Sequence, residues 1–178
     1  MDATAHYRNL AKLGREEFFA GTAPAALVRT SLRGLVDSNT TMQVARAATN
    51  TLDDEEPAET IQAQVRLPTS PPAAELEVYP LTKKPGASFP DRITIGRTPN
   101  NDIVISDQSI SRLHAYARFD RGGWFVADAG SKNGSWLDKL TLDARKERPI
   151  QSKAKLRLGD IDLMFFVAQD LFTVLGGV

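Results

Sequence analysis

The chain has 178 residues, of which 22 are basic and 22 acidic, so its formal net charge is zero. This balance argues against a general binder of nucleic acid or of a membrane surface, because both depend on a concentrated positive field. The absence of cysteine excludes disulfides, thiolate metal sites and cysteine nucleophiles. Charged residues interrupt the first twenty positions, and no apolar run approaches the about 20 residues that span a bilayer. We therefore expect a cytoplasmic protein that does not contact a membrane.

Residues 1–36 are predicted to form a helical hairpin. Tyr7, Leu10 and Phe18 fall near one helical face. Pro24 suits the first turn of a second helix, in which Val28, Leu32, Leu35 and Val36 would make an apolar stripe. Two short helices bury little by themselves, so the stripe is expected to pack on the rest of the chain or on a partner.

Residues 37–75 are predicted to be a flexible linker. Thr, Ser, Asn, Ala and Pro dominate its composition, and an acidic run covers residues 53–56. Such a segment cannot bury enough apolar area to offset the entropy lost on ordering.

Residues 76–178 are predicted to be all-β. The hydrophobic period changes to two in many short runs, among them 76–79, 93–95, 103–105, 124–127, 154–158, 161–167 and 172–175. Turn residues such as Arg121-Gly122-Gly123 and Gly159-Asp160 separate the runs. Short strands with frequent turns and no helices between them are typical of a sandwich or barrel.

Three polar clusters stand at predicted strand ends, where loops carry function on a rigid scaffold. They are Gly96-Arg97, residues 109–115 and residues 128–135. Together they supply guanidinium, ammonium, hydroxyl and carboxamide groups, which are donors suited to an anion. Few of these groups could act as an acid, a base or a nucleophile, which disfavours an enzyme.

The order of these clusters resembles the forkhead-associated (FHA) domain family. Gly96-Arg97, Ser111-x-x-His114 and Asn133-Gly134 follow one another as in that family, and the resemblance covers about residues 74–170. It implies an FHA-like β-sandwich of about eleven strands that binds phosphothreonine in a short extended peptide. It also implies a signalling adaptor or regulator acting downstream of Ser/Thr kinases, with no cofactor and no metal.

The resemblance also implies roles for single residues. Arg97 and Ser111 would contact the phosphate directly, and Asn133 would hydrogen-bond the peptide backbone. Arg112 and Lys132 stand where further contacts to phosphate or peptide occur. Support of the site would come from the remaining matched positions, Gly96, His114 and Gly134. Ser135 and Asp138-Lys139 depart mildly from the common pattern, and the basic insert at 140–152 is expected to affect peptide preference.

Two questions stay open at this point. The linker threonines Thr40, Thr41, Thr51 and Thr60 are possible phosphoacceptors, and Thr51 has an acidic residue three positions later, which many FHA domains select. The linker would then dock into its own domain or promote self-association. The alternative is a phosphorylation-independent assembly or scaffold protein that uses the N-terminal hairpin as its contact surface.

Overall fold

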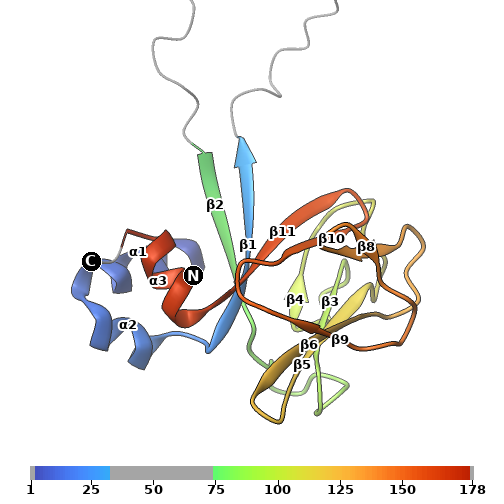
Figure 1. The fold of residues 1–178 in the computed structure, drawn as a ribbon, viewed down its shortest axis with the longest axis horizontal. Helices are drawn as coiled ribbons and strands as arrows, with labels where there is room; N and C mark the ends of the chain where they lie inside the picture. Colours follow the sequence, from blue (N-terminus) through green and yellow to red (C-terminus); the bar gives the residue numbers. More distant parts are fainter. Residues whose placement is uncertain (1–2, 33–73, 177–178) are drawn as a thin grey trace, which may run out of the picture. The chain divides into compact units, whose positions relative to one another are not determined.

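The computed structural model describes residues 3–32 and 74–176. Strands predominate, with short helices near both ends of the chain (Figure 1). The elements follow one another as α1 (Ala3–Leu13), α2 (Arg15–Gly21), β1 (Ala25–Leu32), β2 (Ala74–Pro80), β3 (Ile93–Gly96), β4 (Ile103–Val104), β5 (Ala115–Asp120), β6 (Gly123–Asp128), β7 (Ser135–Leu137), β8 (Leu140–Thr141), β9 (Arg148–Ile150), β10 (Lys155–Leu158), β11 (Ile161–Val167) and α3 (Ala168–Val174). No helix in these two ranges has the length and apolar character needed to cross a membrane.

The strands form two sheets, and the predicted all-β sandwich is confirmed. One sheet has six strands in the order β2-β1-β11-β10-β7-β8, and the other has five in the order β4-β3-β5-β6-β9. The described residues thus contain eleven strands, the number that the FHA resemblance implies. Strand β3 pairs with β4 in parallel and with β5 in the antiparallel sense.

Tight turns set the register of two hairpins. The turn between β5 and β6 has Arg121 at φ 49° and Gly122 at φ 80°, and the turn between β7 and β8 has Asp138 at φ 47° and Lys139 at φ 71°. Two consecutive residues with positive φ are typical of the turn whose twist matches that of the flanking strands. Asp138-Lys139 therefore makes the same kind of turn as the Asn-Gly pair that it replaces.

The main core lies between the two sheets. Its side chains include Leu156 and Phe165 from the six-stranded sheet and Ile95 and Val126 from the five-stranded sheet, each at most 1% exposed. Removing such side chains from water supplies most of the free energy that favours folding. The loops that carry the polar clusters extend from this rigid body.

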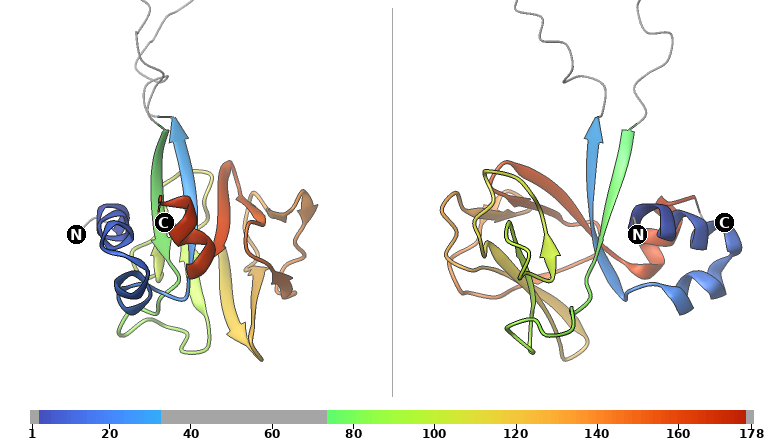
Figure 2. Two further views of the ribbon diagram at one scale, coloured as in Figure 1. Left: turned by 60° about the vertical axis from the view of Figure 1, so that its left-hand side comes forward. Right: turned by 180° about the vertical axis from the view of Figure 1, so that it is seen from behind.

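A second core lies on the other face of the six-stranded sheet. There α1, α2 and α3, which together we call the helical cap, lie on the same side of β1 and β11 (Figure 2). The Phe18 ring packs against those of Tyr7 and Phe172, with centroids 5.9 and 5.2 Å away. In β11, Phe165 belongs to the main core and its neighbour Phe166 to the second core.

Helix α1 of the helical cap also contacts the edge strand of the sheet. The Thr4 hydroxyl of α1 accepts a hydrogen bond of 3.0 Å from the Val78 N–H of β2. Strand β2 is the outermost strand on its side of the sheet. This contact occupies one backbone donor that the edge strand would otherwise offer to another chain.

The second helix predicted within residues 1–36 is wrong, because residues 25–32 form strand β1. Ala25 and Leu27 face the main core, while Ala26 and Val28 face the second core. A strand buried on both faces has no alternation of apolar and polar residues, so its pattern resembles that of a buried helix. Leu35 and Val36 lie outside the described residues.

The boundary predicted between a linker and a β-domain at residue 76 also changes, because residues 25–32 form strand β1. The predicted linker, residues 37–75, was placed before a β-domain spanning 76–178. Strands β1 and β2 instead belong to one sheet as neighbours, so residues 33–73 connect two adjacent strands of one domain. Residues 33–73 themselves, with Thr40, Thr41, Thr51 and Thr60, lie outside the described residues.

The strand predicted at 172–175 is also wrong. Residues 168–174 form α3. Its Leu171 and Phe172 are buried in the second core, and Leu175, which follows the helix, packs half-buried against that core. Three apolar residues at this spacing fit one face of a helix as well as a short strand. The tertiary contact with α2 decides between them.

The second core predicts a large difference between two adjacent aromatic residues. Phe18→Ala should lower the free energy of unfolding by about 3–5 kcal/mol, because its side chain is fully buried. Phe19→Ala should cost about 1 kcal/mol or less, since Phe19 is 38% exposed. Urea denaturation monitored by tryptophan fluorescence measures both values. Similar losses for the two variants would contradict the packing of the helical cap.

Candidate functional site

Three loops that follow strands β3, β4 and β6 surround one cavity of about 900 Å³, which we call the loop cavity. Its walls are made by Arg97, Thr98, Asn100, Gln108, Ser109, Ile110, Ser111, Arg112, Leu113, Gly130, Lys132 and Asn133. All five residues predicted to contact a phosphopeptide are among them. The sequence clusters, distant along the chain, are thus brought together at one site.

The loop cavity is electropositive. Arg97, Arg112 and Lys132 are exposed, and none of its lining residues is acidic. In the described part of the chain, no carboxylate forms a salt bridge with these three cations. Their charges therefore remain available to an anion.

Ser111 is held by its backbone. Its N–H donates to His114 Nδ1 at 3.0 Å, and its carbonyl oxygen accepts the Arg97 N–H at 3.0 Å. The Ser111 hydroxyl oxygen accepts the backbone N–H of Lys132 at 2.9 Å. A serine hydroxyl that accepts can still donate its own hydrogen, so Ser111 can bind an acceptor oxygen in the loop cavity.

The His114 imidazole connects two of the loops. Besides accepting from Ser111, it donates from Nε2 to the Gly134 carbonyl oxygen at 3.0 Å. The ring is fully buried. Burial lowers the pKa of His114, while the hydrogen bond to Gly134 and the charge of Asp128 oppose that shift. The neutral form is thus the one that these two hydrogen bonds require.

Gly96 lets strand β3 approach the backbone of the second loop. A Cβ atom at this position would clash with the Arg112 carbonyl oxygen and lie 2.7 Å from Asn101 Nδ2. The same Asn101 amide donates to the carbonyl oxygens of Thr98, at 2.9 Å, and Arg112, at 2.6 Å. Only a residue without a side chain fits at this position, and Asn101, to which the sequence analysis assigns no role, braces the same backbone.

Asp128 organises the third loop. Its carboxylate accepts hydrogen bonds from the N–H groups of Gly130 and Ser131, at 2.7 and 2.8 Å, and from the hydroxyls of Ser131 and Ser135. Burial acts to raise the pKa of Asp128, but the hydrogen bonds from the serines and the backbone outweigh it and lower the pKa. Asp128 is therefore a weak base. An Asp at a strand end, followed by Gly and Ser, is the sequence signal of such a loop.

Asp102 anchors the first loop in a similar way. It accepts from Lys83 Nζ at 2.7 Å, from the Lys84 N–H at 2.8 Å and from the Thr94 N–H at 2.8 Å. Burial acts to raise the pKa of Asp102, yet these hydrogen bonds lower it. The sequence analysis assigns no role to this half-buried ion pair, because Lys83 lies 19 residues before Asp102.

Asn133 and Gly134 complete the third loop. The Asn133 Nδ2 donates to the Ser109 carbonyl oxygen at 2.8 Å, which leaves the side-chain oxygen and a second amide hydrogen for a ligand. Gly134 has φ 84°, a left-handed conformation that favours glycine. No group of histidine and acidic residues placed to hold a metal ion occurs within 3–32 and 74–176.

The contact at Gly96 predicts a steric effect on stability. Gly96→Ala should lower the free energy of unfolding by about 2–3 kcal/mol, because the new methyl group must displace the Arg112 backbone. Gly123→Ala is the matched control, since its Cβ would meet no atom closer than 3.8 Å. Thermal denaturation of both variants tests this. A Gly96→Ala protein as stable as Gly123→Ala would contradict the close approach.

The buried imidazole predicts a pH-dependent stability. Because the pKa of His114 is lower in the folded state, the unfolded chain binds the proton first. Stability should be fully present above about pH 6.5 and fall below it, by at most about 1.4 kcal/mol per pH unit, until the folded-state pKa is passed. Urea denaturation across this range measures the slope. His114→Gln should remove this part of the slope, and His6→Gln, at an exposed position, should retain it.

Comparison with known proteins agrees with this geometry. The sequence profile described as FHA domain matches residues 93–159, which include Gly96, Arg97, Ser111, His114 and Asn133. A solved structure of the N-terminal FHA domain from S. cerevisiae Rad53p with a phosphothreonine peptide is similar over 55% of this chain and 89% of that one, at 19% identity and a TM-score of 0.44. This weak structural likeness adds nothing to the assignment.

Two relatives with higher sequence identity support assignment of the chain to a family. The oxoglutarate dehydrogenase inhibitor of Corynebacterium diphtheriae is 33% identical over 100 residues, which cover 54% of this chain and 68% of the relative. The protein of the same name from Corynebacterium efficiens is 33% identical over 72 residues, or 40% of this chain and 49% of the relative. The chain thus spans about half to two thirds of the length of these relatives, which are named as inhibitors. The profile match and the C. diphtheriae relative together show that the chain belongs to the FHA domain family.

Proposed function

We propose that the chain binds a phosphorylated threonine on a partner protein and acts as a signalling adaptor or regulator downstream of a Ser/Thr kinase. The observation that carries the proposal is the loop cavity, in which three cations that pair with no described carboxylate surround a Ser111 hydroxyl that is held in place. The related proteins are named as inhibitors, which agrees with a regulatory role.

The charges explain how phosphate would be recognised. A phosphothreonine carries a charge of about −1.5 to −2 and three acceptor oxygens at neutral pH. Arg97 with Arg112 or Lys132 nearly neutralises this charge, while Ser111 donates to one oxygen. An unphosphorylated threonine leaves these donors without their partner, so the missing anion provides the discrimination.

Phosphate dependence is the first expected result. A phosphothreonine peptide should bind at least ten times more tightly than the same peptide without phosphate. Arg97→Ala should weaken binding of the phosphothreonine peptide at least tenfold, because a charge-assisted hydrogen bond contributes about 1.5–3 kcal/mol. Isothermal titration calorimetry measures both affinities. Arg8→Ala, an exposed cation on α1, is the control and should leave binding unchanged.

Equal affinity for the two peptide forms would overturn the proposal. Binding that survives Arg97→Ala would favour a phosphorylation-independent assembly module. That alternative was based on a helical hairpin as its contact surface. The hairpin's second helix is strand β1, in which Ala25, Ala26, Leu27 and Val28 are already buried.

The connecting segment supplies a candidate ligand within the same chain. Thr51 precedes Asp54 by three positions, and residues 33–73 are tethered to the domain at β1 and β2. Tethering raises the effective concentration of a phosphorylated threonine to about the millimolar range. We include in the proposal that a phosphorylated linker threonine, Thr51 first among Thr40, Thr41 and Thr60, competes for the loop cavity.

Competition would appear as weaker binding of an external peptide. Phosphorylation of the chain in vitro should reduce its affinity for a phosphothreonine peptide or cause self-association, and Thr51→Ala should prevent the effect. The competition is excluded if mass spectrometry shows phosphorylated Thr51 while the peptide affinity and the mass from light scattering stay unchanged. That outcome would not affect the phosphothreonine proposal itself.

A further inference from the structure

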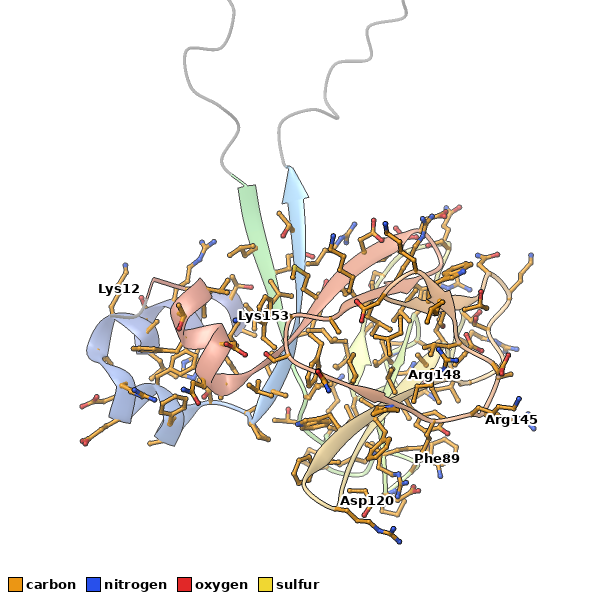
Figure 3. The ribbon with its side chains drawn as sticks, in the orientation of Figure 1. Lys12, Phe89, Asp120, Arg145, Arg148 and Lys153 are labelled. Atoms are coloured by element: carbon orange, nitrogen blue, oxygen red, sulfur yellow. The ribbon has the colours of Figure 1, made fainter. Side chains whose placement is uncertain are left out.

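The helical cap covers only part of the outer face of the six-stranded sheet. Beyond the cap, a hollow of about 750 Å³ crosses β1, β11, β10 and β7, and we call it the sheet groove. Lys153, which pairs with Asp170 of α3 at 3.1 Å, lies where the cap meets the β-sandwich (Figure 3). The residues that line the sheet groove and those that line the loop cavity have no member in common. The sheet groove is therefore a separate feature of the domain.

One row of cross-strand partners makes an apolar floor for the sheet groove. Val28 of β1 pairs with Met164 of β11, and Met164 pairs with Lys155 of β10. Directly opposite side chains on neighbouring strands share one face of a sheet and contact one another. Val28 belongs to the second core, and Met164, half-buried, packs against that core. The floor thus continues the second core to a point where the helical cap no longer covers it.

A second row makes a wall of stacked side chains. Trp136 of β7 pairs with Arg157 of β10, whose guanidinium lies 5.6 Å from the centroid of the indole ring. The Arg157 Nε donates to the Gly159 carbonyl oxygen at 2.9 Å, which holds the guanidinium in place. Trp136 is half-buried. The stack therefore presents apolar surface beside a fixed positive charge.

The rim of the sheet groove has an excess of positive charge. Lys139 and Lys155 are exposed and form no salt bridge with any carboxylate of the described residues. Arg157 pairs with Asp160 at 3.5 Å, and Asp162 is the only acidic side chain among the described residues that line the groove. An apolar surface bordered by such lysines is complementary to acidic residues of a partner.

The strands beneath the sheet groove favour a helix over an extended segment as its occupant. Strand β10 lies between β11 and β7, and β11 lies between β1 and β10, so each is paired on both sides. An extended segment lying on them would find no backbone ladder to join, whereas a helix satisfies most of its backbone groups internally. The helical cap packs in this manner on the adjoining part of the same face.

We propose that the sheet groove docks an amphipathic helix of a partner protein, with acidic residues flanking the apolar stripe of that helix. The apolar side chains pack on Met164 and Trp136, and the carboxylates pair with Lys139 and Lys155. The inference goes beyond the proposed function, because this contact requires no phosphate and leaves the loop cavity free. The domain then has two binding surfaces, one for phosphothreonine and one for an acidic helix.

Two designed helical peptides test the proposal. Both have about 18 residues, long enough to be helical by themselves, and a leucine stripe at positions i, i+3, i+4 and i+7. One peptide has glutamates on both sides of the stripe, and the other has lysines there. Fluorescence anisotropy should show that the acidic helix binds the chain about tenfold more tightly than the basic one, and added salt should reduce the difference.

Charge reversal in the chain locates the binding. Lys155→Glu should weaken the acidic helix about tenfold and strengthen the basic helix, a gain that a misfolded variant would not give. Its affinity for a phosphothreonine peptide should stay unchanged. Arg148→Glu is the matched control, because Arg148 is exposed on β9 of the five-stranded sheet (Figure 3). This variant should bind both helices as the unaltered chain does.

Four results would overturn the proposal. The first two are equal affinity for the two helices, including no binding of either, and binding that Lys155→Glu leaves unaltered. The third is a mass that rises with concentration by light scattering in the unaltered chain but not in Lys155→Glu, since a second copy would then occupy the groove. The fourth is an affinity for the acidic helix that rises about tenfold when alanine replaces all four acidic residues of the run 53–56, because that run would then be the occupant. None of these results affects the phosphothreonine proposal.

Discussion

The His114 ring lies fully buried between two loops, where it accepts the Ser111 N–H and donates to the Gly134 carbonyl oxygen. Neither loop belongs to a sheet, so neither has a ladder of backbone hydrogen bonds to hold it. One neutral imidazole satisfies a donor from one loop and an acceptor from the other, and thereby fixes their separation. The hydroxyl of Ser111 meets the backbone of Lys132 across this same junction. The candidate site depends on that separation, although His114 is not among the residues that line the loop cavity.

Around this junction, polar groups divide into two kinds. The inner ones, such as Asn101, Asp102 and Asp128, are buried and hydrogen-bonded. Within the described residues, Thr22 Oγ1 is the only buried side-chain polar atom without a partner. The outer ones, Arg97, Arg112 and Lys132, are exposed cations that form no salt bridge with any described carboxylate. Burying an unpaired charge costs several kcal/mol, so a folded chain can keep unpaired charges cheaply only at its surface. The arrangement separates the groups that build the site from those available to a ligand.

Strands β1 and β11 connect the β-sandwich, which carries the candidate site, to the helices near the two ends of the chain. Each is buried on both faces, by the main core on one side and by the helical cap on the other. The N-terminal helices are therefore part of the domain rather than an appendage. The segment between β1 and β2 is likewise an insertion within one sheet, so a threonine on it is tethered at both ends to the domain that would bind it.

The sequence by itself determined the main β-sandwich and the composition of the site. Period-two runs such as 154–158 predict strands with one solvent-exposed face. The ordered motifs at Gly96-Arg97, Ser111 and Asn133 identify the loops, because turn chemistry and motif spacing are local properties of the sequence. Tertiary structure alone decided the state of residues 25–32 and 168–174, whose apolar residues fit a helix or a strand equally until the surface that covers them is known. It also decided that Lys83 pairs with Asp102 and that Asn133 donates to the Ser109 carbonyl oxygen. These relations join residues far apart in the chain, and no local pattern encodes a distance between them.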